Sequence, residues 1–377
     1  MTINANSSIA AKAIAKEYIA RIALYETPGV GNKIAKALTE YYGAATTVFE
    51  QTTLSELAQF PQLRPTVAQA IRDRVAWEAA EAEWQHIKKQ GICLLSKGLP
   101  GYPERLTHCP DAPFLLYYKG KAALNASKVI AVVGTRKPSE KGRRFCAQLM
   151  EELRPYQPLV VSGLAYGIDV TTHRRCLEVG LSTVGVVAHG LDHIYPTQHH
   201  QVAERMVQQG GLLSEFKSDT IVHTKHFPMR NRIIAAIADA VVVVETGRKG
   251  GSMITAHFAN EYHRDVFAVP GGLADPLARG CNHLIKTHRA CLLESAADLA
   301  YVLGWEACKH PAQQSLFEAL EQSEVAVVQQ LLKGEQPLEL LVQHTAISSA
   351  ELAPVLIELE LKGIIRALPG KRFQLRR

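Results

Sequence analysis

The chain of 377 residues is 47% hydrophobic and 21% charged, the composition of an ordinary soluble globular protein with room for two or three domains. Its 42 Lys and Arg against 36 Asp and Glu give a formal net charge of +6, modest for a nucleic-acid-binding protein. No apolar run is long enough to span a membrane, and the seven cysteines include no C-x-x-C pair for a zinc or redox site. Because the net charge is modest, only the positions of the cations along the chain can indicate whether it binds an anionic partner.

The N-terminus does not have the pattern of a secretion signal. Lys12 and Lys16 lie where a signal peptide has an apolar core. We therefore expect a cytoplasmic protein with reduced thiols and no contact with a membrane.

Residues 27–38, TPGVGNKIAKAL, recur in degraded form 33 residues later as FPQLRPTVAQAI. Each copy reads as a helix, a tight turn and a helix, so we predict a helical domain over 1–82 that resembles a helix-hairpin-helix or SAM-like module. In the first copy Gly29 and Gly31 let the turn approach a phosphate, with Lys33 beside it, whereas the second copy lacks both glycines. DNA contact by the first copy and a purely structural role both stay open.

The part of the chain from 83 to 305 is predicted to be one α/β domain. An aromatic and proline-rich stretch at about 85–127 has short strand-like runs and is interpreted as its N-terminal extension. From 129 onward, apolar runs alternate with helical periodicity, which indicates a parallel sheet covered on both faces, that is, a Rossmann-like doubly wound fold. The expected strands are VIAVVG, LVVSG, TVGVVAHG, GLLSEF, AVVVVET and DVFAVPGG.

Residues 306–320 are predicted to be a linker and 321–377 a C-terminal domain. Three helical stretches, EVAVVQQLL, PLELLVQHT and SAELAPVLIELELKG, precede a hairpin in IIRALPGKRFQL, an order typical of a winged helix. The expected recognition helix carries Glu351, Glu358 and Glu360, which phosphates would repel. We therefore predict a protein-contact or regulatory role for this domain.

Cations and glycines gather at the ends of the predicted strands, where an open parallel sheet binds its ligands. A helix start is positive because of the helix macrodipole, so each Arg or Lys there costs roughly 0.3–1 kcal/mol unless an anion compensates. Three turns show the pattern or its glycines: Gly134, Arg136 and Lys137; Ser162 and Gly163; and Arg248, Lys249, Gly250, Gly251 and Ser252, the last as expected N-cap.

The segment FPMRNRIIAAI at 227–237 again places cations at a predicted helix start. Pro228 is expected at the first helical position, so Arg230, Asn231 and Arg232 would fall in the first turn. These helix starts should open on one edge of the sheet, and their spread suits a polyanion better than one small phosphate. The alternative is that each cation is an ordinary solvated side chain.

Signals for catalysis or a cofactor are weak. The glycine-rich turns lack G-x-G-x-x-G, and GRKGGS lacks the G-K-[ST] of a Walker A loop. Asp169, Asp192, Glu215 and Glu245 fall near strand ends, where capping is the stronger interpretation, and the histidines at 189–200 lack metal-ligand spacing. We expect no enzyme activity, no cofactor and no metal.

In these same segments the sequence resembles the DprA (Smf) family of DNA-processing proteins. The match runs in order through SGLAYGID, GLDHIYP, LLSEF, FPMRNRIIA, GGSMITA and FAVPGG, over about 85–300. The resemblance implies a Rossmann-like protein that binds and protects single-stranded DNA during natural transformation. It also implies a homodimer formed through the Rossmann-like domain, and loading of the RecA recombinase.

The resemblance also implies which residues face DNA. Phe227 is either a stacking platform, worth roughly 1–3 kcal/mol per base, or a core residue. The chain departs from the family pattern at 172–174, at His263 and in LIKTHRA, which concerns packing or the dimer surface more than DNA binding. The DNA-binding set is Gly134, Arg136, Ser162, Gly163, Phe227, Arg230, Asn231, Arg232, Gly251 and Ser252, with Lys225 nearby and Lys137, Lys249 and Gly250 added from the cation pattern.

Two other functions stay open: a nucleotide phosphoribohydrolase, although VPGGLADPL keeps only the first three residues of P-G-G-x-G-T, and a regulator that reads duplex DNA through the terminal helical modules. If the chain binds a single strand, affinity should fall by about 0.7 log units per phosphate contact per log unit of salt. Removing Arg136, Arg230 and Arg232 together should then flatten that slope by about two units.

Overall fold

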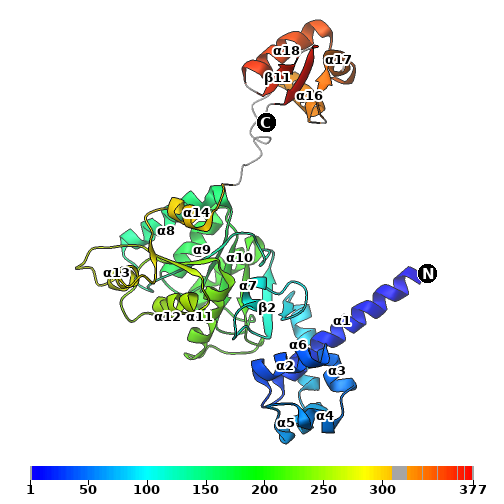
Figure 1. Cartoon of the computed structure of the whole chain (residues 1–377), viewed down its shortest axis with the longest axis vertical. Coiled ribbons are helices and arrows are strands. Elements are labelled where there is room, and N and C mark those ends of the chain that lie inside the picture. Colours follow the sequence, from blue (N-terminus) through cyan, green and yellow to red (C-terminus); the bar gives the residue numbers. More distant parts are fainter. Residues whose placement is uncertain are drawn as a thin grey trace. The chain divides into compact units, whose positions relative to one another are not determined.

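The computed structural model describes residues 2–307, 321–332, 334–345, 347–362, 364–368 and 370–375, with side chains from Lys12 onward. Residues 1–307 form one compact unit and 308–377 a second (Figure 1). The two units are described separately below.

The first unit begins with helices only, as the sequence predicts. The repeat is visible in the backbone, because Gly29 has a φ of 90° and Gln62, at the equivalent place 33 residues later, has a φ of 69°. The two copies pack together, since a Cβ on Gly29 would lie 2.8 Å from Cγ2 of Val67. The helices are α1 (Thr2–Glu26), α2 (Gly31–Tyr42), α3 (Ala45–Glu50), α4 (Leu54–Gln59), α5 (Pro65–Arg72) and α6 (Trp77–Lys89).

The expected domain boundary at 82 falls inside α6. One hydrophobic core runs from Leu38 of α2 to Phe114 and Leu212 beyond that boundary. Arg21 of α1 donates from Nη1 to Oγ of Ser96, at 2.8 Å, and to the carbonyl of Lys97, also at 2.8 Å. The N-terminal helices are therefore joined to the sheet by apolar packing and by buried hydrogen bonds.

A sheet of nine strands in the order β1-β2-β6-β5-β4-β3-β7-β8-β9 forms the centre of the unit. All six predicted strands are present and mutually parallel, and β9 extends them at one edge. The extension at 85–127 adds β1 and β2, which pair antiparallel with each other and with β6. The strands are β1 (Cys93–Ser96), β2 (Leu115–Gly120), β3 (Val129–Val133), β4 (Leu159–Ser162), β5 (Thr183–Val187), β6 (Gly211–Ser214), β7 (Ala240–Val243), β8 (Asp265–Ala268) and β9 (Cys291–Leu292).

Helices cover both faces of the parallel part, as a doubly wound fold requires (Figure 1). Within β3, Ala131 packs on the face covered by α11 and α12, whereas Ile130 packs on the face covered by α8, α9 and α14. The helices after β1 are α7 (Glu104–Thr107), α8 (Glu140–Leu153), α9 (Ile168–Val179), α10 (His200–Gln209), α11 (His226–Ile237), α12 (Gly251–Glu261), α13 (Arg279–Lys286) and α14 (Ala296–Leu303), with 3-10 turns at Arg154–Tyr156 and Thr197–His199.

The strand order reverses at β3. From β3 the chain adds β4, β5 and β6 on one side, then returns to place β7 and β8 on the other. The segments that follow β3 and β7 therefore lie next to each other at the carboxyl edge of the sheet. In such folds this switch point is where ligands bind.

The second unit is a winged helix, as predicted from its pattern of elements. Its core includes Val327, Leu341 and Leu356 from the three helices, with Ile365 from the sheet. Lys362, the main cation of the expected recognition helix α18, pairs with the carboxylate of buried Glu324 at 2.7 Å. The elements are α16 (Gln322–Leu331), β10 (Gln336–Pro337), α17 (Leu338–Thr345), α18 (Ser349–Leu361), β11 (Ile365–Leu368) and β12 (Arg372–Leu375), with sheet order β10-β12-β11.

Two further expectations concern membrane spans and the departure from the family pattern at His263. Among the helices that the structure describes, no single one is long and apolar enough to cross a membrane, and α17 with α18 passes by length and composition only as a pair bent by 110°. His263, where the family resemblance leads one to expect glycine, has a φ of 55°. That left-handed conformation is one that glycine adopts at least cost, which accounts for the expectation.

Candidate nucleic-acid interface

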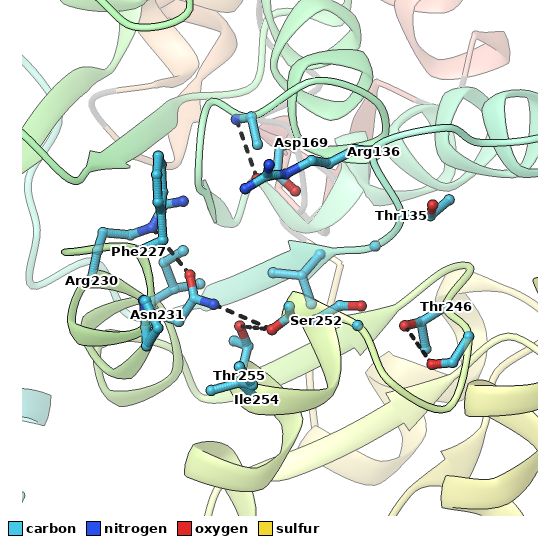
Figure 2. A pocket seen from close by; sticks show the side chains of 18 of the residues that line it. Thr135, Arg136, Asp169, Phe227, Arg230, Asn231, Thr246, Ser252, Ile254 and Thr255 are labelled. Atoms are coloured by element: carbon cyan, nitrogen blue, oxygen red, sulfur yellow. Dashed lines mark hydrogen bonds between the residues drawn. The ribbon is translucent and has the colours of Figure 1, made fainter. Parts of the chain in front are cut away.

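A cavity of about 330 Å³ lies at the switch point, and we call it the strand-end pocket. Its wall is built by the segments after β3 and β7, by α11 and the N-terminal half of α12, and by Ala165 and Asp169 of the GLAYGID motif (Figure 2). The predicted DNA-binding residues that line it are Gly134, Arg136, Phe227, Arg230, Asn231, Lys249, Gly250, Gly251 and Ser252.

The start of α12 supplies hydrogen-bond donors to this pocket. Gly250 occupies the N-cap position and no side chain caps the helix, so the expectation that Ser252 is the N-cap was wrong: Ser252 is the second residue of α12. The first backbone N–H groups of a helix have no partner within the helix. The Ser252 hydroxyl is buried and has no hydrogen-bond partner among the described residues. Unfilled donors at a positive helix end form a ready-made anion site.

Arg230 is fixed at the back of the pocket and is only 4% exposed. Its Nη1 donates to the backbone carbonyls of Gly163 and Val186, and its Nε donates to Oδ1 of Asn231 at 3.2 Å. Helix α11 begins at His226, so Arg230 is its fifth residue and lies beyond the first turn. The prediction that Arg230 and Arg232 occupy the first turn was wrong by one turn. The free-energy cost of placing these two cations on α11 therefore comes from their burial and not from the helix dipole.

Asp169 lies beside Arg230 and was not among the predicted site residues. Burial raises its pKa to about 6, although Arg230, the Ala165 amide and the Ser162 hydroxyl act in the opposite direction. Burial also lowers the pKa of Arg230 to about 10. The motif GLAYGID, which ends in this aspartate at the start of a helix, was the available signal.

The raised pKa of Asp169 makes stability depend on pH in a definite direction. Between about pH 4 and pH 6 the folded chain holds a proton that the unfolded chain has lost, so raising the pH through this window lowers the free energy of unfolding. Relative to Asp169→Asn, the natural chain should lose on the order of 2–3 kcal/mol across it. Urea unfolding of both proteins at several pH values measures this, and parallel curves would contradict the assignment.

Aromatic side chains form the rim of the strand-end pocket. The Arg136 guanidinium carbon lies 5.4 Å from the centre of the half-buried Phe227 ring, and the Tyr195 ring lies 6.2 Å from it. Arg136, Phe227 and Tyr195 also line an adjoining cavity of about 80 Å³ together with Tyr166. Sequence reasoning missed the two tyrosines, which are 43% and 46% exposed and follow strand ends in GLAYGID and HIYP. This rim offers ring faces on which bases could stack.

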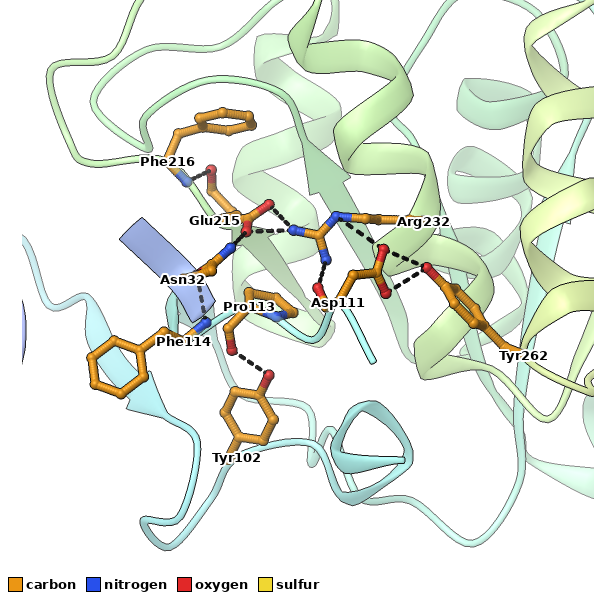
Figure 3. A network of polar contacts seen from close by, with 10 residues as sticks. Asn32, Tyr102, Asp111, Pro113, Phe114, Glu215, Phe216, Arg232 and Tyr262 are labelled. Atoms are coloured by element: carbon orange, nitrogen blue, oxygen red, sulfur yellow. Dashed lines mark hydrogen bonds and ion pairs between the residues drawn. The ribbon is translucent and has the colours of Figure 1, made fainter. Parts of the chain in front are cut away.

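The structure does not bring Arg232 to the pocket. Its guanidinium forms an ion pair with both carboxylate oxygens of Glu215 and donates to the backbone carbonyl of Asp111 (Figure 3). Glu215 also accepts from Nδ2 of Asn32 at 2.9 Å, which ties α2 to the end of β6. The expectation that Arg232 faces the same anion as Arg230 is therefore corrected: Arg232 joins the N-terminal helices to the sheet.

Four other predicted residues lie behind or outside the strand-end pocket. Ser162 is fully buried and donates to the carbonyl of Val132 at 2.5 Å. Gly163 lines the adjoining cavity, and a Cβ there would lie 2.5 Å from Oδ2 of Asp169. Lys137 and Lys225 are exposed and line neither cavity. Ser162 and Gly163 thus position the wall of the pocket. Lys137 and Lys225 lie close to wall residues in the sequence but outside the wall itself.

The other strand-end carboxylates are engaged in structural contacts. Glu245 accepts from the backbone and hydroxyl of Ser139 at 2.9 and 2.5 Å, and Asp192 pairs with His86 at 2.8 Å. In the part of the chain that the structure describes, no group of three His, Cys, Asp or Glu side chains could hold a metal ion. The geometry supports binding of an anion better than acid–base chemistry.

These features define a class of protein: a doubly wound α/β domain with a pocket lined by cations and glycines at its switch point, followed by a winged helix. Residues 93–304 match the profile described as DNA recombination-mediator protein A, and residues 310–371 match the DprA winged helix domain. The chain therefore belongs to the DprA/Smf family of DNA-processing proteins.

Individual relatives agree with this assignment. Protein Smf of Synechocystis sp. is 32% identical over 312 residues, which are 74% of this chain and 78% of the relative. DNA processing protein A of Streptococcus pneumoniae has a crystal structure that matches with a TM-score of 0.65 at 32% identity, over 77% of this chain and 98% of that chain. DNA processing protein A of Helicobacter pylori, whose structure is described by its single-stranded DNA binding mode, matches with a TM-score of 0.52 at 28% identity, over 57% and 97%.

Proposed function

We propose that this chain binds single-stranded DNA in the strand-end pocket, holding backbone phosphates at the start of α12 and base faces at the aromatic rim. The observation that carries the proposal is the buried Ser252 hydroxyl, which has no hydrogen-bond partner in the part of the chain that the structure describes. It lies among the pocket-lining residues with the cations Arg136 and Lys249 and the Phe227 ring. A phosphate supplies the acceptor that this hydroxyl lacks.

A single strand fits these features better than a duplex. Stacking on Phe227, Tyr166 or Tyr195 requires a free base face, and in a duplex both faces of each base are already stacked. The winged helix does not favour duplex binding either. Lys362 is paired with Glu324, and the expected recognition helix α18 carries three glutamates, which phosphates would repel. Since backbone and ring-face contacts do not read base edges, we expect little sequence preference.

We propose binding rather than catalysis as the role of the pocket. Among the described residues that line the cavity, Asp169 is the one carboxylate, and it lies beside Arg230. The VPGG segment that motivates the phosphoribohydrolase alternative places Gly271 and Gly272 on a different cavity, beside Glu245. Release of free base from a nucleoside monophosphate by the purified protein would favour the enzyme instead.

We further propose that the chain protects incoming DNA in natural transformation, acts as a homodimer formed through the Rossmann-like domain and passes the bound strand to the RecA recombinase. This proposal rests on the family and on the description of its profile as a recombination mediator. It assigns no residue to either protein contact. It needs no cofactor, and it places the chain in the cytoplasm, where such a strand would meet the recombinase.

The proposal is tested by titrating labelled oligothymidylate and a duplex of the same length at two salt concentrations. We expect tighter binding of the single strand and an affinity that falls as salt rises. Equal or tighter binding of the duplex would support the regulator, and the absence of single-strand binding would refute the proposed function.

Arg136→Gln should weaken binding and flatten the salt dependence. Each lost phosphate contact removes about 0.7 from the slope of log affinity against log salt, so the slope should change by about that amount. Arg205→Gln on α10 is the matched control, because Arg205 is exposed and lines neither cavity. If both variants have the slope of the natural chain, Arg136 does not contact the strand.

A further inference from the structure

A larger cavity, of about 510 Å³, lies between α2 and α11, and we call it the α2 groove. None of the predicted DNA-binding residues except Arg232 lines it. The lining residues that matter here are Lys33, Lys36, Glu40, Asp111, Met229 and Arg232.

The α2 groove gathers positive charge from two parts of the chain. Lys33 and Lys36 are three residues apart on α2, so they lie on one face of the helix. Lys97, which follows β1, lies beside Lys36: burial and that neighbouring ammonium group lower the pKa of Lys97 to about 8. Two cations held this close carry a repulsion that a bound anion would relieve.

The carboxylates nearby do not cancel this charge. Glu40 raises the pKa of Lys97, but its effect is smaller than those of burial and Lys36. Asp111 accepts from the Tyr262 hydroxyl at 2.7 Å and lies 3.8 Å from Nε of Arg232. Arg232 is itself committed to Glu215. Lys97 donates to the carbonyl of Thr107 at 3.4 Å, so Lys33 and Lys36 are the lining groups left to meet an external anion.

The α2 groove and the strand-end pocket flank the beginning of one helix. Met229 of α11 lines the groove and is 44% exposed, while its neighbours Pro228 and Asn231 line the pocket. Beyond the lysines, Tyr41 in the last turn of α2 is 73% exposed and packs edge-on against Phe60 at 5.6 Å. A DNA strand that leaves the strand-end pocket over α11 would therefore meet the lysines of α2 first and the Tyr41 ring next.

We propose that the α2 groove is a second contact for the same DNA strand, in which Lys33 and Lys36 hold phosphates beyond those in the strand-end pocket and Lys97, beside Lys36, adds positive charge. This inference rests on the proposed function and makes the helical repeat part of the DNA path. An acidic segment of a partner protein would suit the lysines as well, but continuity with the pocket and the exposed ring of Tyr41 favour a nucleic acid.

The test compares a short oligothymidylate of about 5 nucleotides with a long one of about 20, since one binding module covers roughly 4–16 nucleotides. Lys33→Gln with Lys36→Gln should leave the short strand's affinity unchanged. For the long strand it should weaken binding and lower the salt slope by about 1.4, that is, two phosphate contacts. Lys88→Gln with Lys89→Gln is the matched control, because both lysines are exposed on α6 and line neither cavity.

The outcomes separate this inference from the proposed function. If the natural chain binds neither strand, the proposed function fails. If it binds both but the α2 variant matches the natural chain on the long strand, the strand does not enter the groove and only this inference is overturned. Protection of Lys36 from acetylation by the long strand, but not by the short one, is the second readout expected, and equal labelling would overturn the inference in the same way.

Discussion

Replacing Arg230 by glutamine is expected to lower the free energy of unfolding by about 3–5 kcal/mol and to abolish single-strand binding. The substitution leaves Asp169 buried without its cation and removes the Nη1 donor that bonds the carbonyls of Gly163 and Val186. It also removes positive charge from the strand-end pocket. Urea unfolding and a strand titration at a temperature where the variant stays folded measure the two effects.

Asp169→Asn combined with Arg230→Gln supplies the control. Because the double variant has no buried charge in this pair, it should be more stable than Arg230→Gln alone, while binding stays weak. If Arg230→Gln unfolds within about 1 kcal/mol of the natural chain, the structural role of Arg230 is wrong, since surface changes have effects of about this size or less. If the variant still binds the strand tightly, the role of Arg230 in binding is wrong.

Arg232→Met should also destabilise the chain by about 3–5 kcal/mol, for a different reason. Glu215 is almost fully buried, and among the described residues the variant leaves Asn32 alone to bond its carboxylate. The loss should loosen the N-terminal helices from the sheet, because Glu215 bonds both α2 and α11. Thermal unfolding measures the stability, and hydrogen exchange at α2 measures the loosening.

A second substitution distinguishes pairing from simple loss of volume. Adding Glu215→Gln to Arg232→Met removes the unpaired charge and keeps an acceptor for Asn32, so part of the lost stability should return. If the two effects add without any recovery, the pair contributes nothing beyond packing and the interpretation of Arg232 as a structural ion pair is wrong.

The parallel sheet could be predicted because its strands are nearly continuous apolar runs, such as VIAVV and AVVVV, that only a doubly covered sheet can bury. The antiparallel pairing of β1 and β2 with β6 could not, since strands of 4 and 6 residues within an aromatic segment do not indicate a partner. The sequence also did not reveal that the N-terminal helices and the sheet form one unit across residue 82. The bonds of Arg21 to Ser96 and Lys97 that join them link residues 75 and 76 positions apart, and no local pattern indicates such contacts.

The segments that form the strand-end pocket could be predicted, but not the direction of each side chain within them. Arg230 and Arg232 are two residues apart on α11, which turns their side chains about 200° from each other. One can therefore line the strand-end pocket only if the other points away from it. From the sequence, α11 was expected to begin at Pro228, whereas the helix begins at His226, so the sequence did not indicate which of the two arginines lines the pocket.

A crystal structure of the chain with a short oligothymidylate tests the central claim most directly. We predict a phosphate within hydrogen-bond distance of the Ser252 hydroxyl and of the backbone at the start of α12, with a base against the Phe227 ring. A strand bound elsewhere on the protein, with the strand-end pocket left empty, would contradict the claim.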